Sequence, residues 1–329
     1  MGTYFADSGS AGNSLSGELY RLASEFEPAI RASRVGHLLG AKIPEVQPGT
    51  KASFSYLLRS MFVDASDLNP GNRIIGQPVP VAEAGKWKDV SGVLSDWGEM
   101  AVIDGSDGYI LGNNDDFLAQ SELGVRLSLT HCLDVIDKRC AEVLGAGSTP
   151  WSAADQAASG SWESNTYNPL ADILSALTTH EGTAGNEALT PNRVAMVCGT
   201  RTYRAMLGNT NMTALFGGSV GMGVLSDEQL RSALSSVGIS DLFVGIDAYY
   251  SSTVTLYSRP PGDSATVFTT PSGRMVESAG IITPHAGVDF FHTREHDIDP
   301  RRYGVYVYAH CDPAVIVPEF GIRITGTYT

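Results

Sequence analysis

One short segment of the sequence matches the pattern of a serine nucleophile. Residues 217–221 (GGSVG) fit G-x-S-x-G, in which a sharp turn from strand to helix exposes the serine to its base. No strand-like sequence leads directly into the motif, no helix follows it directly, and the glycines continue to Gly223. This context predicts a flexible loop, so a hydrolase that uses Ser219 is an alternative function and not the main hypothesis.

A second segment carries residues that could bind a metal ion. His292, Glu295 and His296 fit the pattern H-x-x-E-H, which binds zinc when a helix brings both imidazoles onto one metal. The residues before the segment are strand-like, and Pro300 follows within four residues. We therefore predict a solvated charged turn here, and a His292/His296 metal site is the second enzymatic alternative.

Other signatures of catalysis or of cofactor binding are absent from the sequence. We find no P-loop, no dinucleotide fingerprint after a strand, no Asp-rich calcium loop and no CxxC pair. The four cysteines are far apart and lie mostly in apolar stretches, as buried thiols do; they are Cys132, Cys140, Cys198 and Cys311. We expect no catalytic, metal-binding or cofactor-binding residues, and we expect that the protein is not an enzyme.

Composition and charge narrow the class of protein further. The chain has 329 residues, 43% of them hydrophobic, which is enough for a sizeable core and for two domains. A net charge of -14 with only 22 basic residues argues against a surface that grips nucleic acid through many phosphate contacts. No signal peptide or membrane-spanning run is present, so synthesis in the cytoplasm is expected.

The longest periodic segment is residues 113–144, which we predict to be a helix. Asn114 can cap its start and Gly145 follows its end. Its apolar residues recur at three- and four-residue intervals and form one stripe, which requires a sheet or another helix as a partner. Leu123 and Leu127 point almost opposite this stripe, so we expect a second apolar contact there.

The chain before this helix contains two segments without a core of their own. Residues 1–17 are small, polar and glycine-rich and predict an arm that another molecule orders. Residues 18–35 have helical spacing interrupted by Pro28, which favours two short helices. Strand-like sequence at 52–58 and at 90–103 flanks about thirty loosely patterned residues, which indicate a long inserted loop.

The chain after residue 144 contains a second folding unit. Residues 145–164 are rich in Gly, Ala and Ser and predict a linker. Asn168 then caps a helix, the run 194–198 predicts a buried strand, and Ser226 with Gln229 forms a capping box for another helix. Strand-like runs follow one another from residue 253 to residue 324.

This order of segments resembles the major capsid proteins of tailed bacteriophages, which have the Hong Kong 97-like fold. The likeness lies in NPLADILSALTTHEG followed by LTPNRVAMVCGTRTYRAML, with Tyr203 at the aromatic position, and in the ending GVYVYAHCDPAVIVPEFGIRI. The resemblance implies an α+β capsid fold. Its expected parts are an arm and short helix (1–35), a peripheral domain (36–164) with an extended loop (about 59–90) and a spine helix (about 114–144), an α/β axial domain (165–290), and peripheral strands (291–329).

The resemblance also implies the function and the partners. Many copies would form hexamers and pentamers of an icosahedral shell around double-stranded DNA, touched without sequence specificity, and the mature location would be the virion. Scaffolding, portal and decoration proteins are the expected partners, with a separate scaffolding protein because little sequence precedes the first helix. The expected subunit-interface residues are Phe5, Phe62, Arg73, Lys86, Trp87, Leu123 and Leu127.

A cellular nanocompartment of the encapsulin type shares the same fold and is the main alternative. Some members of the capsid family join subunits covalently, through a lysine on the extended loop and an asparagine on another subunit. Lys86 and Lys88 lie in the region of that loop, but we can match no asparagine to the partner position.

Overall fold

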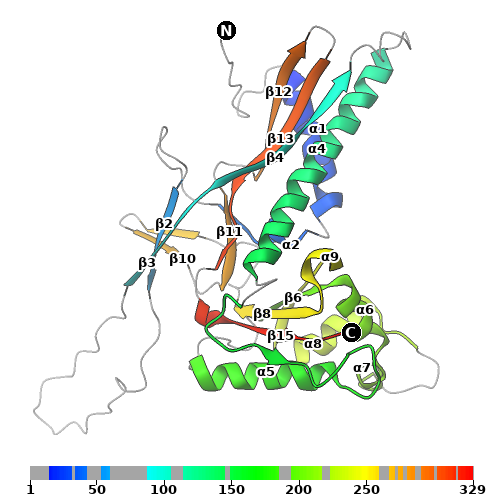
Figure 1. Cartoon of the computed structure of the whole chain (residues 1–329), viewed down its shortest axis with the longest axis vertical. Helices are drawn as coiled ribbons and strands as arrows, with labels where there is room; N and C mark the ends of the chain where they lie inside the picture. Colours follow the sequence, from blue (N-terminus) through cyan, green and yellow to red (C-terminus); the bar gives the residue numbers. More distant parts are fainter. Residues whose placement is uncertain are drawn as a thin grey trace, which may run out of the picture.

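The computed structural model describes residues 15–31, 34–42, 53–59, 87–104, 114–144, 149–184, 194–216, 223–258, 267–270, 273–276, 280–285, 290–299, 302–315 and 318–328. These residues form an α+β structure with two main sheets, one of six strands and one of five. The two sheets lie toward opposite ends of the molecule, and a long helix runs from one to the other (Figure 1).

The six-stranded sheet is built around β13 (Arg302–Cys311). This strand pairs antiparallel with β12 (His292–Asp299) and, over its whole length, with β4 (Ser95–Asp104). Because side chains alternate along a strand, the buried hydrophobic side chains of β13 share one face; they are Val305, Val307, Ala309 and Cys311. The remaining strands are short: β1 (Gly40–Lys42), β11 (Ile281–His285) and β14 (Ala314–Val315).

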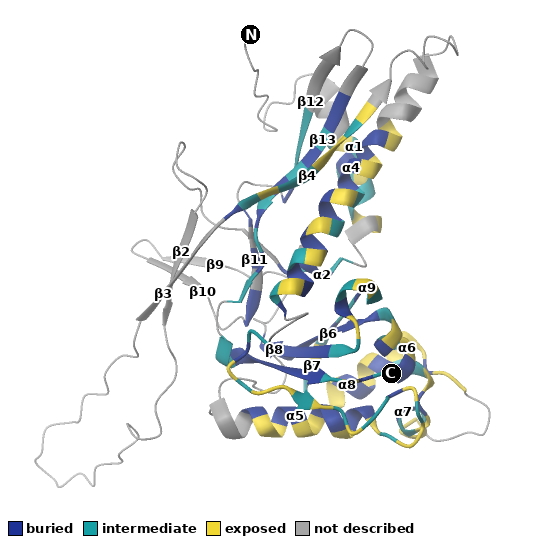
Figure 2. Cartoon of the chain, in the orientation of Figure 1, coloured by how far each residue is buried: buried dark blue, intermediate teal, exposed yellow. Residues whose placement is uncertain are grey.

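Helix α4 (Asn114–Val143) covers this apolar face of the sheet. Val125, Leu129, Cys132 and Ile136 lie three or four residues apart, are fully buried, and pack on the buried side chains of β13. In Figure 2 the buried and exposed residues of α4 alternate with the helical period. The predicted helix and the packing of its stripe on β13 are therefore confirmed.

Helix α1 (Leu15–Arg31) lies beside α4 and reaches β12. Ala23 is fully buried between these elements, and the ring centroids of Tyr20 and Phe291 are 5.8 Å apart. The prediction of two short helices is wrong, because the helix continues through the exposed Pro28. A proline inside a helix removes one hydrogen bond, and the packing of the buried face of α1 offsets that loss.

Two hairpins extend from the sheet. Strand β2 (Ser53–Arg59) pairs with β3 (Trp87–Val93), which runs through Leu94 into β4, and β9 (Val267–Thr270) pairs with β10 (Gly273–Val276). The strands predicted on either side of the inserted loop are thus present. The loop itself, residues 60–86, lies outside the described residues.

The five-stranded sheet has the order β5 (Gln156–Ala157), β15 (Gly321–Thr325), β8 (Thr253–Ser258), β6 (Val194–Gly199) and β7 (Ile239–Gly245). Its helices are α5 (Pro169–Ala184), α6 (Thr200–Gly208), α7 (Thr210–Ala214), α8 (Asp227–Ser236) and α9 (Asp247–Tyr250). Both predicted caps are present: the Leu170 amide donates to Asn168 Oδ1 at 3.1 Å, and Ser226 and Gln229 form the capping box.

Three sequence predictions are wrong in this part of the chain. Residues 149–164 are not a linker, because Trp162 is fully buried and its Nε1 donates to Asp172 Oδ2 at 2.7 Å. The late strands do not all pack on α4, because β15 pairs with β8 in the five-stranded sheet. The segment from His292 is not a turn, because β12 pairs with β13 from His292 to Asp299.

A third core cluster joins the two sheets. It brings together the last turns of α4, α2 (Val35–Leu38), α9 and strands β6 and β8. Cys140, Ala195, Tyr250 and Tyr257 are all buried in it. We call this contact the joint, because the described residues of both sheets meet there around the end of α4 (Figure 1).

The four cysteines are free and buried, as the sequence predicts. Burial raises the pKa of Cys132 and of Cys198 to about 12. None of the described helices is long and apolar enough to cross a membrane.

Candidate assembly surface

The residues that suggested enzymatic chemistry are not assembled into a site in the described part of the chain. Ser219 lies in the segment 217–222, outside the described residues. His292 and His296 lie on one extended strand, and four residues at about 3.3 Å each separate their backbones by roughly 13 Å. The H-x-x-E-H pattern binds zinc only on a helix, and here its residues form a strand. Within the described residues, no group of three or more His, Cys, Asp or Glu is arranged to hold a metal ion.

The most prominent surface feature of the described residues lies on β4 and on the outer side of α4. Four large apolar side chains are exposed there: Met100 by 39% and Val102 by 55% on β4, and Leu123 by 57% and Leu127 by 48% on α4. Isolated apolar residues are common on protein surfaces, but several together indicate an interaction site. We call this set, with the outer edge of β4, the β4-edge surface.

Contacts between α4 and β4 show how the helix runs along the strand. Cys132 Sγ donates to the Trp97 carbonyl at 3.2 Å, and the Ser128 hydroxyl donates to the Glu99 carbonyl. The helix therefore runs antiparallel to the strand, and the turns that carry Leu123 and Leu127 lie beside the half of β4 that carries Met100 and Val102. The four side chains therefore lie at the same end of the sheet, Leu123 and Leu127 on the outer side of α4 and Met100 and Val102 on the face of β4 that points away from α4.

The backbone of β4 contributes to the same surface. One edge of β4 is paired with β13, and no strand in the described part of the chain pairs with the other edge. An edge strand leaves amide and carbonyl groups unpaired, and proteins cover or charge such edges because they readily bind another strand. Ten residues of open edge beside exposed apolar side chains are therefore suited to contact with another chain.

The side chains of β4 point alternately to the two faces of the sheet. Glu99 points toward α4, where its carboxylate contacts His131. Met100 and Val102 point to the opposite face of the sheet, because they pair with Tyr306 and Gly304. On that face the rings of Tyr306 and Tyr308 stack with centroids 4.9 Å apart, and His310 contacts the Asp96 carboxylate. Burial and the nearby Asp96 raise the pKa of Tyr306, so its hydroxyl remains protonated.

A second, smaller apolar area lies in the unit built on the five-stranded sheet. Leu215 and Phe216 follow α7, and Val224 follows the segment 217–222; all three are exposed. These residues flank residues 217–222, which include Ser219. Leu174 on α5 is exposed separately.

The predicted interface residues fall into two groups. Leu123 and Leu127 are described, and in the single chain they are exposed to solvent and not covered by the chain itself. Trp87 begins β3, where it pairs with Arg59. Phe5, Phe62, Arg73 and Lys86 lie outside the described residues. The structure therefore leaves the roles of all seven as predictions.

Sequence reasoning missed Met100, Val102 and the open edge of β4. The signal was present in four consecutive apolar residues, 100–103, because a strand with one solvated face alternates apolar and polar residues. An unbroken run indicates that both faces or an edge are covered by something else.

No family model matches the sequence, and no curated protein matches it. Similar solved structures exist. A phage-related protein from Bordetella bronchiseptica has a TM-score of 0.58 and 16% identity, over 94% of this chain and 96% of that chain. The virus-like particle from Pyrococcus furiosus has a TM-score of 0.53 and 11% identity, over 94% and 98%. The capsid of the myovirus XM1 is more distant, with a TM-score of 0.47 and 14% identity over 86% and 89%.

The first two structures match this chain over nearly the whole length of both chains. Together with the two-sheet architecture and the long helix, this likeness defines the class of fold. The chain has the Hong Kong 97-like fold, as the resemblance of its sequence segments predicted.

Proposed function

We propose that this chain is the structural subunit of an icosahedral shell, a major capsid protein whose copies form hexamers and pentamers around double-stranded DNA. The observation that carries the proposal is the β4-edge surface on a chain with the Hong Kong 97-like fold. Contact with another chain would cover the edge of β4 that no described strand pairs with and the four apolar side chains exposed at that end of the sheet.

The proposed contacts use this surface together with the parts of the chain that lack a core. In the shell, Leu123 and Leu127 would be covered by a neighbouring subunit. The amino-terminal arm with Phe5 and the extended loop with Phe62, Arg73, Lys86 and Trp87 would reach over adjoining subunits. The unit on the five-stranded sheet would serve as the axial domain, and the six-stranded sheet with α4 as the peripheral domain and its spine.

The other proposed partners follow from the shell function. A separate scaffolding protein, a portal and a decoration protein are proposed, and the mature location is the virion. The net charge of -14 suits a container that encloses DNA without gripping it. The proposed role includes no catalysis, no cofactor and no membrane contact.

Electron microscopy and sedimentation of the purified full chain test this proposal. We expect closed shells, or hexameric and pentameric capsomers that close when a scaffolding protein is supplied. A protein that stays monomeric at high concentration, with and without the scaffold, would contradict the proposal.

A nanocompartment shell is the second candidate, and the likeness to the virus-like particle from Pyrococcus furiosus favours it. The contents of particles purified from the native source separate the two functions. A capsid is expected to protect double-stranded DNA from nuclease, whereas a nanocompartment is expected to hold a cargo protein and no nuclease-protected DNA.

A further inference from the structure

The joint contains a buried carboxyl group that links the two sheets. Asp137 lies on α4 and is fully buried. Its Oδ1 accepts hydrogen bonds from the Gly36 amide at 3.0 Å and from the Tyr250 hydroxyl at 2.8 Å. Gly36 belongs to α2, which leads into the six-stranded sheet, whereas Tyr250 ends α9 between two strands of the five-stranded sheet. One carboxylate oxygen therefore ties elements of both sheets to α4.

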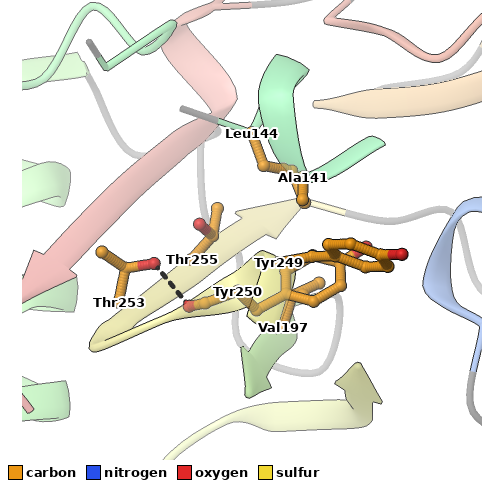
Figure 3. A pocket seen from close by; sticks show the side chains of 7 residues that line it. All are labelled: Ala141, Leu144, Val197, Tyr249, Tyr250, Thr253 and Thr255. Carbon is orange, nitrogen blue, oxygen red and sulfur yellow. Dashed lines mark hydrogen bonds between the residues drawn. The ribbon is translucent and has the colours of Figure 1, made fainter. Parts of the chain in front are cut away.

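The packing around this contact is close but incomplete. A cavity of ≈ 10 Å³ lies beside it, about the size that one water molecule requires. Figure 3 shows Tyr249 and Tyr250 of α9 on one side of the cavity and Ala141 and Leu144 of α4 on the other. Thr253 closes the turn after α9, with its hydroxyl donating to the Tyr250 carbonyl at 3.0 Å. The contact between α4 and α9 therefore has space for about one water molecule next to Tyr250.

The charge of Asp137 is poorly balanced in this position. Among the described residues, no hydrogen-bond partner is found for its buried Oδ2 atom. Burial raises the pKa of Asp137 to about 6, although the Gly36 amide, the Tyr250 hydroxyl, the Arg34 guanidinium and the Val35 amide oppose the change. Arg34 is itself paired with Asp134, so its charge is shared between two carboxylates.

The other titratable groups that face Asp137 do not change charge near neutral pH. Burial is the main cause that raises the pKa of Tyr250 and of Cys140, and the nearby Asp137 adds to it. Both groups therefore stay neutral at this pH. Of these groups, only Asp137 titrates between pH 5 and pH 8.

We propose that Asp137 makes the contact between the two sheets depend on protonation, so that the joint is closed when the carboxyl group is neutral and is biased toward opening when it is ionised. Opening means that α9 moves off the end of α4 and water reaches the carboxylate. The direction follows from solvation: a buried anion with one unpaired oxygen gains more from water than a neutral carboxyl group does. Acid therefore locks the joint, and neutral pH loosens it.

The size of the effect follows from two pKa values, about 6 in the closed joint and the ordinary value of 3.8 when water reaches the group. We define the opening constant as the ratio of open to closed joints. Linkage makes this constant about tenfold larger at pH 8 than at pH 5. At pH 8 it is also about a hundredfold larger than at a pH below both pKa values.

Hydrogen exchange followed by mass spectrometry on the full chain tests the proposal between pH 5 and pH 8. The rates of peptides that cover α2 and α9 are corrected for the intrinsic pH dependence of exchange. We expect protection in these peptides to fall about tenfold from pH 5 to pH 8. Peptides from α8, which lies in the same unit away from the joint, serve as the internal control and should not change.

Two variants identify Asp137 as the group responsible. Asp137→Asn keeps an oxygen that accepts from Gly36 and Tyr250 but cannot ionise, so protection at the joint should become independent of pH. Tyr250→Phe removes one hydrogen bond to the carboxylate, which should raise the pKa in the closed joint and move the midpoint of the change to higher pH. A flat profile in the natural protein, an unchanged profile in Asp137→Asn, or, if that variant does not fold, an unmoved midpoint in Tyr250→Phe would overturn the proposal.

Discussion

Replacing Leu123 and Leu127 by alanine provides the sharpest test of the β4-edge surface. About half of each side chain is already buried in the single chain. Full burial of a leucine contributes about 1.5–3 kcal/mol, so covering the exposed half at a subunit contact contributes about 1 kcal/mol for each residue. Losing both is expected to weaken each contact by about 2 kcal/mol, or about thirtyfold in its association constant.

The assay is the concentration at which the purified protein assembles, measured by sedimentation velocity over a dilution series. We expect the double variant to need a markedly higher concentration than the natural protein. Its thermal unfolding as a free subunit is measured in parallel, because the half of each leucine that is buried in the single chain also contributes to subunit stability, a loss that the high helix propensity of alanine offsets only in part.

The matched control is Leu174→Ala on α5, where a leucine with 46% exposure lies outside the β4-edge surface. This variant should assemble as the natural protein does. Equal effects of the control and of the double variant on assembly, or no effect of either, would refute the assignment of this surface.

Three further predictions concern the free subunit. The four cysteines should not react with a thiol reagent at pH 8 until the protein is denatured. The reason is that all four are buried and that burial raises the pKa of Cys132 and Cys198 to about 12. Fast labelling of any of them in the native protein would contradict this prediction. Gly98→Ala should destabilise the subunit by about 1–3 kcal/mol in urea unfolding, because the new Cβ would lie 2.5 Å from the Val307 carbonyl oxygen. The control Gly208→Ala meets nothing within 4 Å and should be neutral or stabilising. Equal effects of the two substitutions would count against the close strand contact at Gly98. Ser226→Ala should cost about 1 kcal/mol by removing the capping box of α8, and Ser236→Ala at the other end of the same helix should cost less; an unfolding midpoint that does not move in Ser226→Ala would show that the cap contributes nothing.

The elements that could be predicted from the sequence are those specified by neighbouring residues. Helix α4 has its start signal and its apolar stripe within one segment, and α8 has a capping box within four residues. The same is true of α5, because Asn168 and Pro169 define its start. Local hydrogen bonds and helical periodicity are sufficient in these cases.

The predictions that failed depend on contacts between distant residues. Nothing in residues 321–325 indicates that they pair with β8 and not with the strands around β13, since both choices bury the same side chains. The polar sequence of β12 suits a turn, and pairing with β13 makes it a strand. Residues 149–164 have the composition of a linker, yet Asp172 binds the Ser159 amide and hydroxyl and the Trp162 indole and orders the segment.

Only part of the candidate assembly surface could be predicted, because the other part also depends on a contact between distant residues. The helical period shows that Leu123 and Leu127 lie opposite the buried stripe, whereas the exposure of Met100 and Val102 depends on which edge of β4 is paired. That choice is made by β13, about two hundred residues later in the chain.

The position of β15 has a consequence for the order in which the subunit is made. This strand lies inside the five-stranded sheet, between β5 and β8, yet its residues are synthesised after all the strands of both sheets. A ribosome-bound chain that has already formed β6, β7 and β8 still has an open edge on β8, and long-range pairing of this kind is slow and prone to aggregation. The five-stranded sheet therefore cannot be completed until residues 321–325 have left the ribosome, and until then the edge of β8 that β15 covers stays open.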